Sequence, residues 1–107
     1  MHYDLIIISD YDSEKIFEGI NHLQLHPPHY LIGLNETDNH LTFDYLIFSN
    51  PETLGNQKVL CDQDKIITNY FFQTSLEHLF CIGPISGSYL NPKLHFQKIK
   101  DFLTDPK

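Results

Sequence analysis

The run Leu5-Ile6-Ile7-Ile8 is the feature that most restricts the fold of this chain, and Ser9-Asp10 closes it. All of its residues are apolar and three of them are β-branched. A strand with one solvated face alternates polar and apolar residues, so an unbroken apolar run is typical of a strand buried on both faces, as in a parallel sheet. We therefore expect a parallel sheet with residues 5–8 in its interior.

The residues that follow predict a β-α-β unit. Asp12 or Ser13 can cap a helix, and apolar residues then recur at helical spacing: Ile16, Phe17, Ile20 and Leu23. His-Pro-Pro-His at residues 26–29 should end this helix, because proline lacks a backbone donor and restricts the residue before it. Tyr-Leu-Ile-Gly-Leu at residues 30–34 is the second predicted strand, reached by a right-handed crossover.

The rest of the chain predicts three further strand regions and a last helix. Residues 43–48 form an apolar strand, residues 59–60 and 66–67 pair around a polar turn, and residues 79–82 form another buried strand. Residues 92–103 are predicted to be a helix, with these side chains facing inward: Leu94, Ile99, Phe102 and Leu103. The expected fold class is α/β, a Rossmann-like three-layer domain over residues 1–107. It has a mostly parallel central sheet, the N-terminal β-α-β unit and a C-terminal helix.

Composition limits the partners of this chain. Its 107 residues correspond to one domain, and its formal net charge of −7 argues against nucleic acid or anionic lipid as a partner. Met1-His2-Tyr3-Asp4 lacks the basic start of a signal peptide, and no apolar stretch approaches the length that spans a membrane. We expect a cytoplasmic protein in which Cys61 and Cys81 are reduced thiols.

Two segments carry a resemblance to a known family. Residues 3–8 read Tyr-Asp-Leu-Ile-Ile-Ile, and residues 74–83 read Thr-Ser-Leu-Glu-His-Leu-Phe-Cys-Ile-Gly. Together with the order of the elements, they resemble the FAD-binding domain of thioredoxin-reductase-like flavoproteins, the pyridine nucleotide-disulfide reductases, with the NADPH domain missing. The resemblance implies an FAD/NAD(P)-binding-like fold. In that family a Gly-x-Gly-x-x-Gly turn follows the first segment, and an aspartate follows the second.

Both cofactor motifs are changed in this chain. Residues 9–14 contain no glycine and three carboxylates, and Pro84 stands where the family has its aspartate. At ~4 Å and an effective dielectric of about 20, each contact between a carboxylate and a diphosphate costs on the order of 4 kcal/mol. We therefore expect no cofactor, with FAD as the alternative. If a nucleotide binds, the expected contacts are Ser9, Glu36 and Gly83.

Asp10-x-Asp12 after an apolar strand supports another interpretation. It resembles haloacid-dehalogenase-like phosphatases, in which such a pair serves as nucleophile and general acid/base beside Mg²⁺. That mechanism also needs a lysine, for which Lys58 or Lys65 is available, and a late acidic pair, which residues 83–86 do not supply. A turn that caps a helix is the simpler reading of Asp10 and Asp12.

The remaining polar motifs predict no metal site and no catalytic residue. His26 and His29 are two of seven histidines, but a His-x-x-His pair without further ligands is not a zinc signature. Tyr70-Phe71-Phe72 is either core or, where exposed, a protein-contact surface. We expect a small non-catalytic protein with a flavoreductase-like scaffold that acts through protein contacts or self-association. An FAD- or nucleotide-binding redox accessory protein is the alternative, and a small Mg²⁺-dependent haloacid-dehalogenase-like phosphatase that uses Asp10 and Asp12 is the second alternative.

Overall fold

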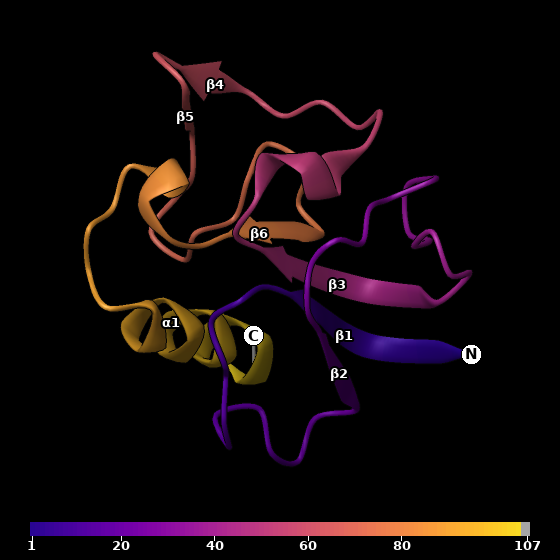
Figure 1. The fold of residues 1–107 in the computed structure, drawn as a ribbon. Helices are drawn as coiled ribbons and strands as arrows, with labels where there is room; N and C mark the ends of the chain where they lie inside the picture. Colours follow the sequence, from indigo (N-terminus) through magenta and orange to yellow (C-terminus); the bar gives the residue numbers. More distant parts are fainter. Residues whose placement is uncertain (106–107) are drawn as a thin grey trace.

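A parallel sheet with one long helix against it organises the molecule (Figure 1), and the computed structural model describes residues 1–105. The elements are β1 (His2–Ile8), β2 (His22–Leu25), β3 (Thr42–Phe48), the 3-10 helix η1 (Pro51–Leu54), β4 (Cys61–Asp62), β5 (Lys65–Ile66), β6 (Leu79–Cys81), the 3-10 helix η2 (Pro84–Ser86) and α1 (Pro92–Thr104). The fold is therefore of the α/β type.

The four strands of the main sheet run in the order β2-β1-β3-β6, and every neighbouring pair is parallel. Residues 5–8 of β1 are fully buried between β2 and β3. This confirms the prediction of an interior parallel strand made from the unbroken apolar run. The predicted strands at residues 43–48 and 79–82 are confirmed as β3 and β6.

Each face of the sheet carries its own apolar core. The helix-side core includes Leu5, Ile7 and Ile47 of the sheet, together with Phe96 and Ile99 of α1. The hairpin-side core lies on the opposite face, where residues of η1 and β5 pack on Ile6, Ile8, Leu46 and Phe48. The hairpin-side face is covered by short turns and a hairpin, whereas the other face is covered by a helix (Figure 1).

The helix predicted after β1 does not form. Residues 9–21 make a series of turns, with backbone bonds from Ile16 N to Ser13 O and from Ile20 N to Phe17 O. Glu14 and Gly19 both have positive φ, which interrupts helical backbone near each end of the predicted segment. The residues that would finish the helix instead form β2. The N-terminal unit is therefore two parallel strands joined by turns.

The predicted strand at residues 30–34 is also wrong. This segment folds back on itself, with Ile32 N bonded to Glu36 O and Asp38 N bonded to Tyr30 O. Only the isolated bridge between Leu31 and Thr37 has β geometry there. The position beside β1 is already taken by β2, which comes earlier in the chain.

The hairpin and the last helix agree with the sequence in outline. β4 pairs with β5 in antiparallel register around Gln63 and Asp64, which both have positive φ, and Ile67 N bonds to Leu60 O beyond the strands. The helix α1 begins after Asn91, whose side chain accepts a hydrogen bond from Lys93 N. Leu94, predicted to face inward, is instead 51% exposed.

Within residues 1–105, the structure contains no helix with the length and apolarity needed to cross a membrane.

Candidate functional site

The carboxyl ends of β1 and β3 are where an α/β sheet of this order would bind a ligand. The chain leaves β1 for β2 on one side, and β3 lies on the other side of β1. Open α/β sheets bind ligands at such a switch point, in the crevice outside the carboxyl ends of the strands. Ser9, Ser49 and Gly83 follow the three strands β1, β3 and β6 there.

Side chains of the protein occupy the space outside the carboxyl ends of β1 and β3. Ser9 is fully buried, and its Oγ accepts hydrogen bonds from Ser49 Oγ and Tyr11 N, both at 2.9 Å. These two bonds use the acceptor capacity of the hydroxyl. The Tyr11 amide is therefore engaged within the turn, where a phosphate group would need free donors.

The side chain of Gln24, in β2, is hydrogen-bonded to both ends of the turn at residues 9–13. Its Oε1 accepts from Ser13 N at 3.3 Å and from Ser13 Oγ at 3.0 Å. Its Nε2 donates to Ser9 O at 3.2 Å and to Tyr11 O at 3.3 Å. One amide side chain thus binds the turn that would be a glycine-rich phosphate loop in the resembled family.

Gly83 is covered by the side chain of Tyr11. A Cβ at this position would lie 3.2 Å from the ring of Tyr11, and the glycine has a φ of +83°. Its amide donates to His95 Nδ1 at 3.1 Å, and His95 Nε2 lies 3.1 Å from Ser88 Oγ. Burial, with a smaller contribution from the charge of Lys98, lowers the pKa of His95.

The candidate nucleotide residues do not converge. Ser9 and Gly83 both contact Tyr11, so the structure brings them to one end of the sheet. Glu36 pairs with Thr42, the first residue of β3, and therefore lies at the opposite end. Its carboxylate is 2.9 Å from His40 Nδ1.

The Asp10-x-Asp12 motif forms a turn. Asp10 is exposed, and Asp12 Oδ1 accepts from Glu14 N at 2.8 Å. The expected capping bond is present, although the helix it was expected to cap is not. Lys65 Nζ is engaged with Pro84 O at 3.3 Å.

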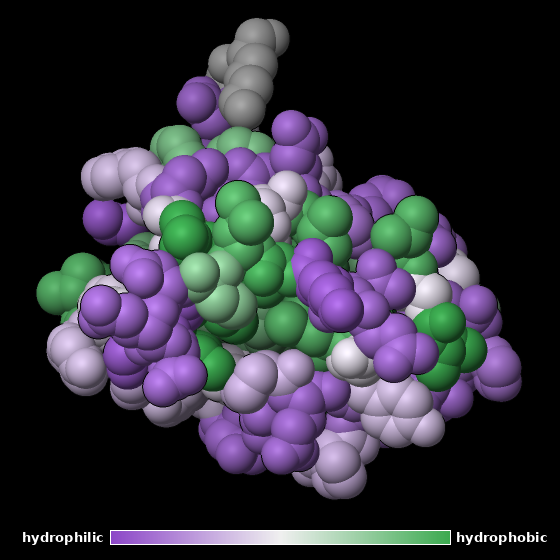
Figure 2. Space-filling view, turned by 90° about the horizontal axis from the view of Figure 1, so that it is seen from above, coloured by the Kyte–Doolittle hydropathy of each residue, from purple (hydrophilic) through white to green (hydrophobic). Residues whose placement is uncertain are grey.

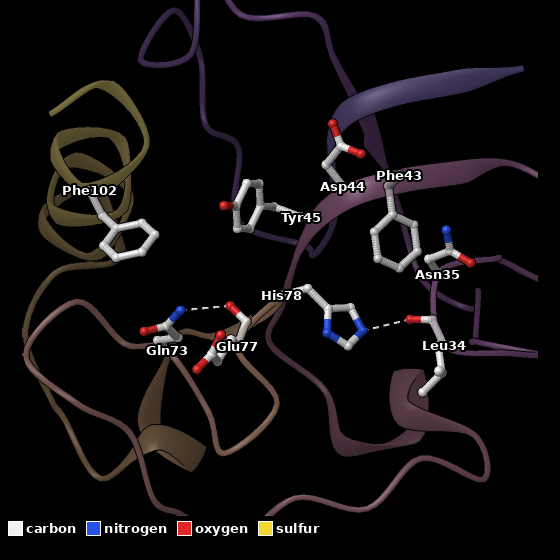
Figure 3. Close-up of a pocket in the computed structure, with 9 residues that line it drawn as sticks. All are labelled: Leu34, Asn35, Phe43, Asp44, Tyr45, Gln73, Glu77, His78 and Phe102. Atoms are coloured by element: carbon white, nitrogen blue, oxygen red, sulfur yellow. Dashed lines mark hydrogen bonds between the residues drawn. The ribbon is translucent and has the colours of Figure 1, made fainter. Parts of the chain in front are cut away.

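A pocket that sequence reasoning missed lies at the amino ends of β3 and β6 (Figure 3). Its volume is about 810 Å³, within the usual range for ligand sites. It is lined by residues of β3, of the segments before β3 and β6, and of α1: Leu34, Asn35, Phe43, Asp44, Tyr45, Gln73, Glu77, His78 and Phe102. The signal in the sequence was Asp44, a charged residue between two aromatic residues inside a strand.

The wall of this pocket is held by the backbone of neighbouring segments. His78 Nε2 lies 2.6 Å from Leu34 O, and its ring is stacked on Phe43 with centroids 6.3 Å apart. Gln73 Nε2 donates to Glu77 O at 2.7 Å. These bonds fix the positions of Glu77 and His78 at the mouth (Figure 3).

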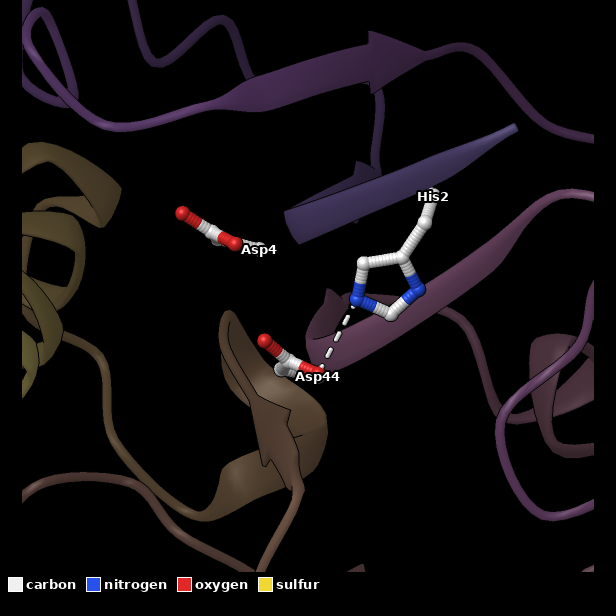
Figure 4. A group of neighbouring side chains, drawn as sticks. All are labelled: His2, Asp4 and Asp44. Atoms are coloured by element: carbon white, nitrogen blue, oxygen red, sulfur yellow. Dashed lines mark hydrogen bonds and ion pairs between the residues drawn. The ribbon is translucent and has the colours of Figure 1, made fainter.

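His2, Asp4 and Asp44 form a group beside this pocket whose nitrogen and carboxylate oxygens lie within 4.8 Å of one another (Figure 4). His2 Nε2 is 3.0 Å from Asp44 Oδ1, and its Nδ1 is 2.8 Å from Thr42 Oγ1. All three residues of the group are exposed, and such groups are common on acidic surfaces. Of His26 and His29, which the sequence did not predict to be a metal site, His29 is bonded to Asp38 at 2.9 Å.

No protein-family model, curated protein or solved structure matches this chain.

Proposed function

We propose that this chain is a small non-catalytic protein that acts through protein contacts. In this proposal its Rossmann-like, three-layer scaffold descends from the FAD-binding domain of thioredoxin-reductase-like flavoproteins. The resemblance of residues 3–8 and 74–83 to that family supports the descent. The proposal predicts that the protein carries no FAD and no nucleotide.

The observation that carries the proposal is the closed end of the sheet. Ser9, Gln24 and Tyr11 bind one another through hydrogen bonds where a dinucleotide would need backbone amides and space. Opening this end would leave polar groups of the buried residues Ser9 and Ser13 without their partners, at about 1–3 kcal/mol for each group. The closed state is therefore the stable one.

An apolar face provides the surface for contacts. Figure 2 looks down on the upper side of the molecule as drawn in Figure 1 and shows apolar side chains gathered in its centre, with hydrophilic ones around them. Leu60 and Ile67 of the hairpin region are 65% and 48% exposed. They flank a groove of about 250 Å³ whose other lining residues are polar: Thr68, Asn69, Gln73, Thr74 and Ser75. We call Leu60, Ile67 and this groove the hairpin face.

The experiment is analytical ultracentrifugation of the purified protein over a range of concentrations, with absorbance recorded in the flavin and protein bands. We expect no flavin absorbance and a mass that rises with concentration through contacts at the hairpin face. Leu60→Asp with Ile67→Asp should abolish this rise. Leu94→Asp, which places one aspartate on an exposed apolar residue of α1, should leave it unchanged.

Two results would contradict the proposal. The first is flavin near one per chain, or tight FAD binding in a calorimetric titration, which would instead support a redox accessory protein. The second is a monomer mass at all concentrations in a protein that also co-purifies with no partner.

A further inference from the structure

We propose that the pocket at the amino ends of β3 and β6 binds an arginine side chain of a partner protein. This inference rests on the proposed function, since it names the chemistry of a partner. It concerns a different surface from the closed carboxyl end of the sheet, and it shares only Gln73 with the hairpin face. Its evidence is the combination of aromatic rings and carboxylates in one cavity.

Aromatic rings form one side of the cavity. In Figure 3 the rings of Phe102, Tyr45 and Phe43 lie in a row, with Glu77 and His78 on one side of the row and Asp44 on the other. Phe43 is itself buried in the hairpin-side core, so the half-buried rings of Tyr45 and Phe102 are the ones that a cation can reach. The centroids of Tyr45 and Phe102 are 6.4 Å apart with their planes nearly perpendicular. Ring faces attract cations within about 6 Å of the centroid, and this attraction strengthens as the cation loses water.

Two carboxylates line the cavity, and its one basic side chain, His78, is bonded to Leu34 O. The carboxylates belong to Asp44 and Glu77, and no lysine or arginine is among the lining residues. Among the described residues, the Glu77 carboxylate has neither a hydrogen-bond donor nor an ion-pair partner, and Asp44 has only His2, on Oδ1. The whole chain adds to this field, with 14 acidic residues against 7 basic ones. An anion is repelled by these carboxylates, whereas a cation is attracted to them.

The aromatic rings and the carboxylates of the cavity together favour a planar cation. A guanidinium group is planar, stacks on aromatic faces and donates hydrogen bonds in pairs to a carboxylate. An ammonium group is a compact, strongly hydrated charge that uses such a wall less well. The Asn35 side chain adds a further acceptor on the lining, whereas Gln73 Oε1 already accepts a hydrogen bond from Asn69 Nδ2.

The source of the arginine is another protein. This chain contains no arginine, because all seven of its basic residues are lysine. A second copy of the chain can therefore offer only lysine to the pocket. Binding of arginine and association through the hairpin face are separate events, and each can fail without the other.

The test is an NMR titration of the ¹⁵N-labelled protein with N-acetyl-arginine amide, and with a short neutral-flanked peptide containing one arginine. A lysine peptide of otherwise identical sequence is the comparison. EDTA is present throughout, to keep divalent cations away from His2, Asp4 and Asp44. We expect shifts confined to the amides around Tyr45, Glu77 and His78, and affinity for arginine about 5- to 10-fold above that for lysine.

Variants test the contributions of the carboxylate and of the aromatic ring separately. Glu77→Gln and Tyr45→Leu should each weaken binding of the arginine peptide about 5-fold or more, whereas Tyr45→Phe keeps the ring and should bind normally. Glu18→Gln makes the same change of charge at an exposed residue outside the pocket and is the matched control. A folded Glu77→Gln spectrum shows that lost binding is not lost structure.

Three results would overturn the inference: no shift with either arginine probe, equal or tighter binding of the lysine peptide, and equal weakening by Glu18→Gln. If N-acetyl-arginine amide and the arginine peptide bind equally, the pocket recognises the side chain alone. Tighter binding of the peptide shows that flanking backbone contributes, and both of these results support an arginine site.

Discussion

At the residue scale, His95 is held in one protonation state by its neighbours. Gly83 N donates to Nδ1, so the proton of the neutral ring is on Nε2, which faces Ser88 Oγ. The ring is buried and stacked on Phe72 with centroids 4.1 Å apart. Adding a proton at Nδ1 would set two donors against each other, in agreement with the lowered pKa.

This arrangement predicts a loss of stability in mild acid. Because the pKa of His95 is lower in the folded protein, the unfolded chain binds the proton more readily once the pH falls below its ordinary value of 6.5. The contribution is complete above that pH and is lost as the pH falls toward the folded-state pKa. Urea denaturation at a series of pH values should show the free energy of unfolding falling more steeply for the wild type than for His95→Gln. Parallel curves for the two proteins would contradict this role.

At the element scale, the first crossover shows why periodicity alone misassigned a segment. Ile16, Phe17, Ile20 and Leu23 have helical spacing, but Leu23 and Leu25 also alternate with polar residues and suit a strand. A four-residue edge strand is too short for this pattern to outweigh the helical one. Glu14 has a φ of 51°, and a glutamate in the sequence does not predict a left-handed backbone conformation.

The helix α1 allows an element-scale test of packing. Ile99 is fully buried in the helix-side core, whereas Leu94 on the same helix is half exposed. Ile99→Ala should lower the free energy of unfolding by about 2–5 kcal/mol, because it removes buried methyl groups and leaves a cavity.

Leu94→Ala is the matched control, and we expect it to change stability by less than about 1 kcal/mol. Chemical denaturation of both variants measures the difference. Comparable losses in the two variants would mean that α1 packs through another face.

At the scale of the whole molecule, β1, β3, β6 and α1 were predictable, whereas β2 and the turns that cover the sheet were not. Residues 5–8 and the run within β3 are typical of buried strands, and Asn91-Pro92 marks the start of α1. The closed carboxyl end depends on Gln24 reaching Ser9 and Ser13, and the pocket depends on His78 reaching Leu34. Such contacts join residues far apart in sequence, and local patterns carry no information about them.

The difference in strand pairing between the main sheet and the hairpin predicts which part of the protein unfolds first. The central strands β1 and β3 are bonded on both sides, while β4 and β5 are two residues each and pair only with each other. Hydrogen exchange should therefore be slowest for amides at residues 5–8 and 46–48 and much faster in β4 and β5. Equal protection of the hairpin and the central strands would contradict this order.

The two cysteines differ in a way that is useful for experiments. Both are free thiols, but Cys61 is exposed and Cys81 is buried. Burial, and to a smaller extent the charge of Cys61, raises the pKa of Cys81 to about 12, so this thiol stays protonated at neutral pH. A maleimide dye added to the native protein would therefore attach at Cys61, next to Leu60. Cys61 is thus a natural and selective attachment site for a dye on the hairpin face, through which we expect the protein to contact other proteins.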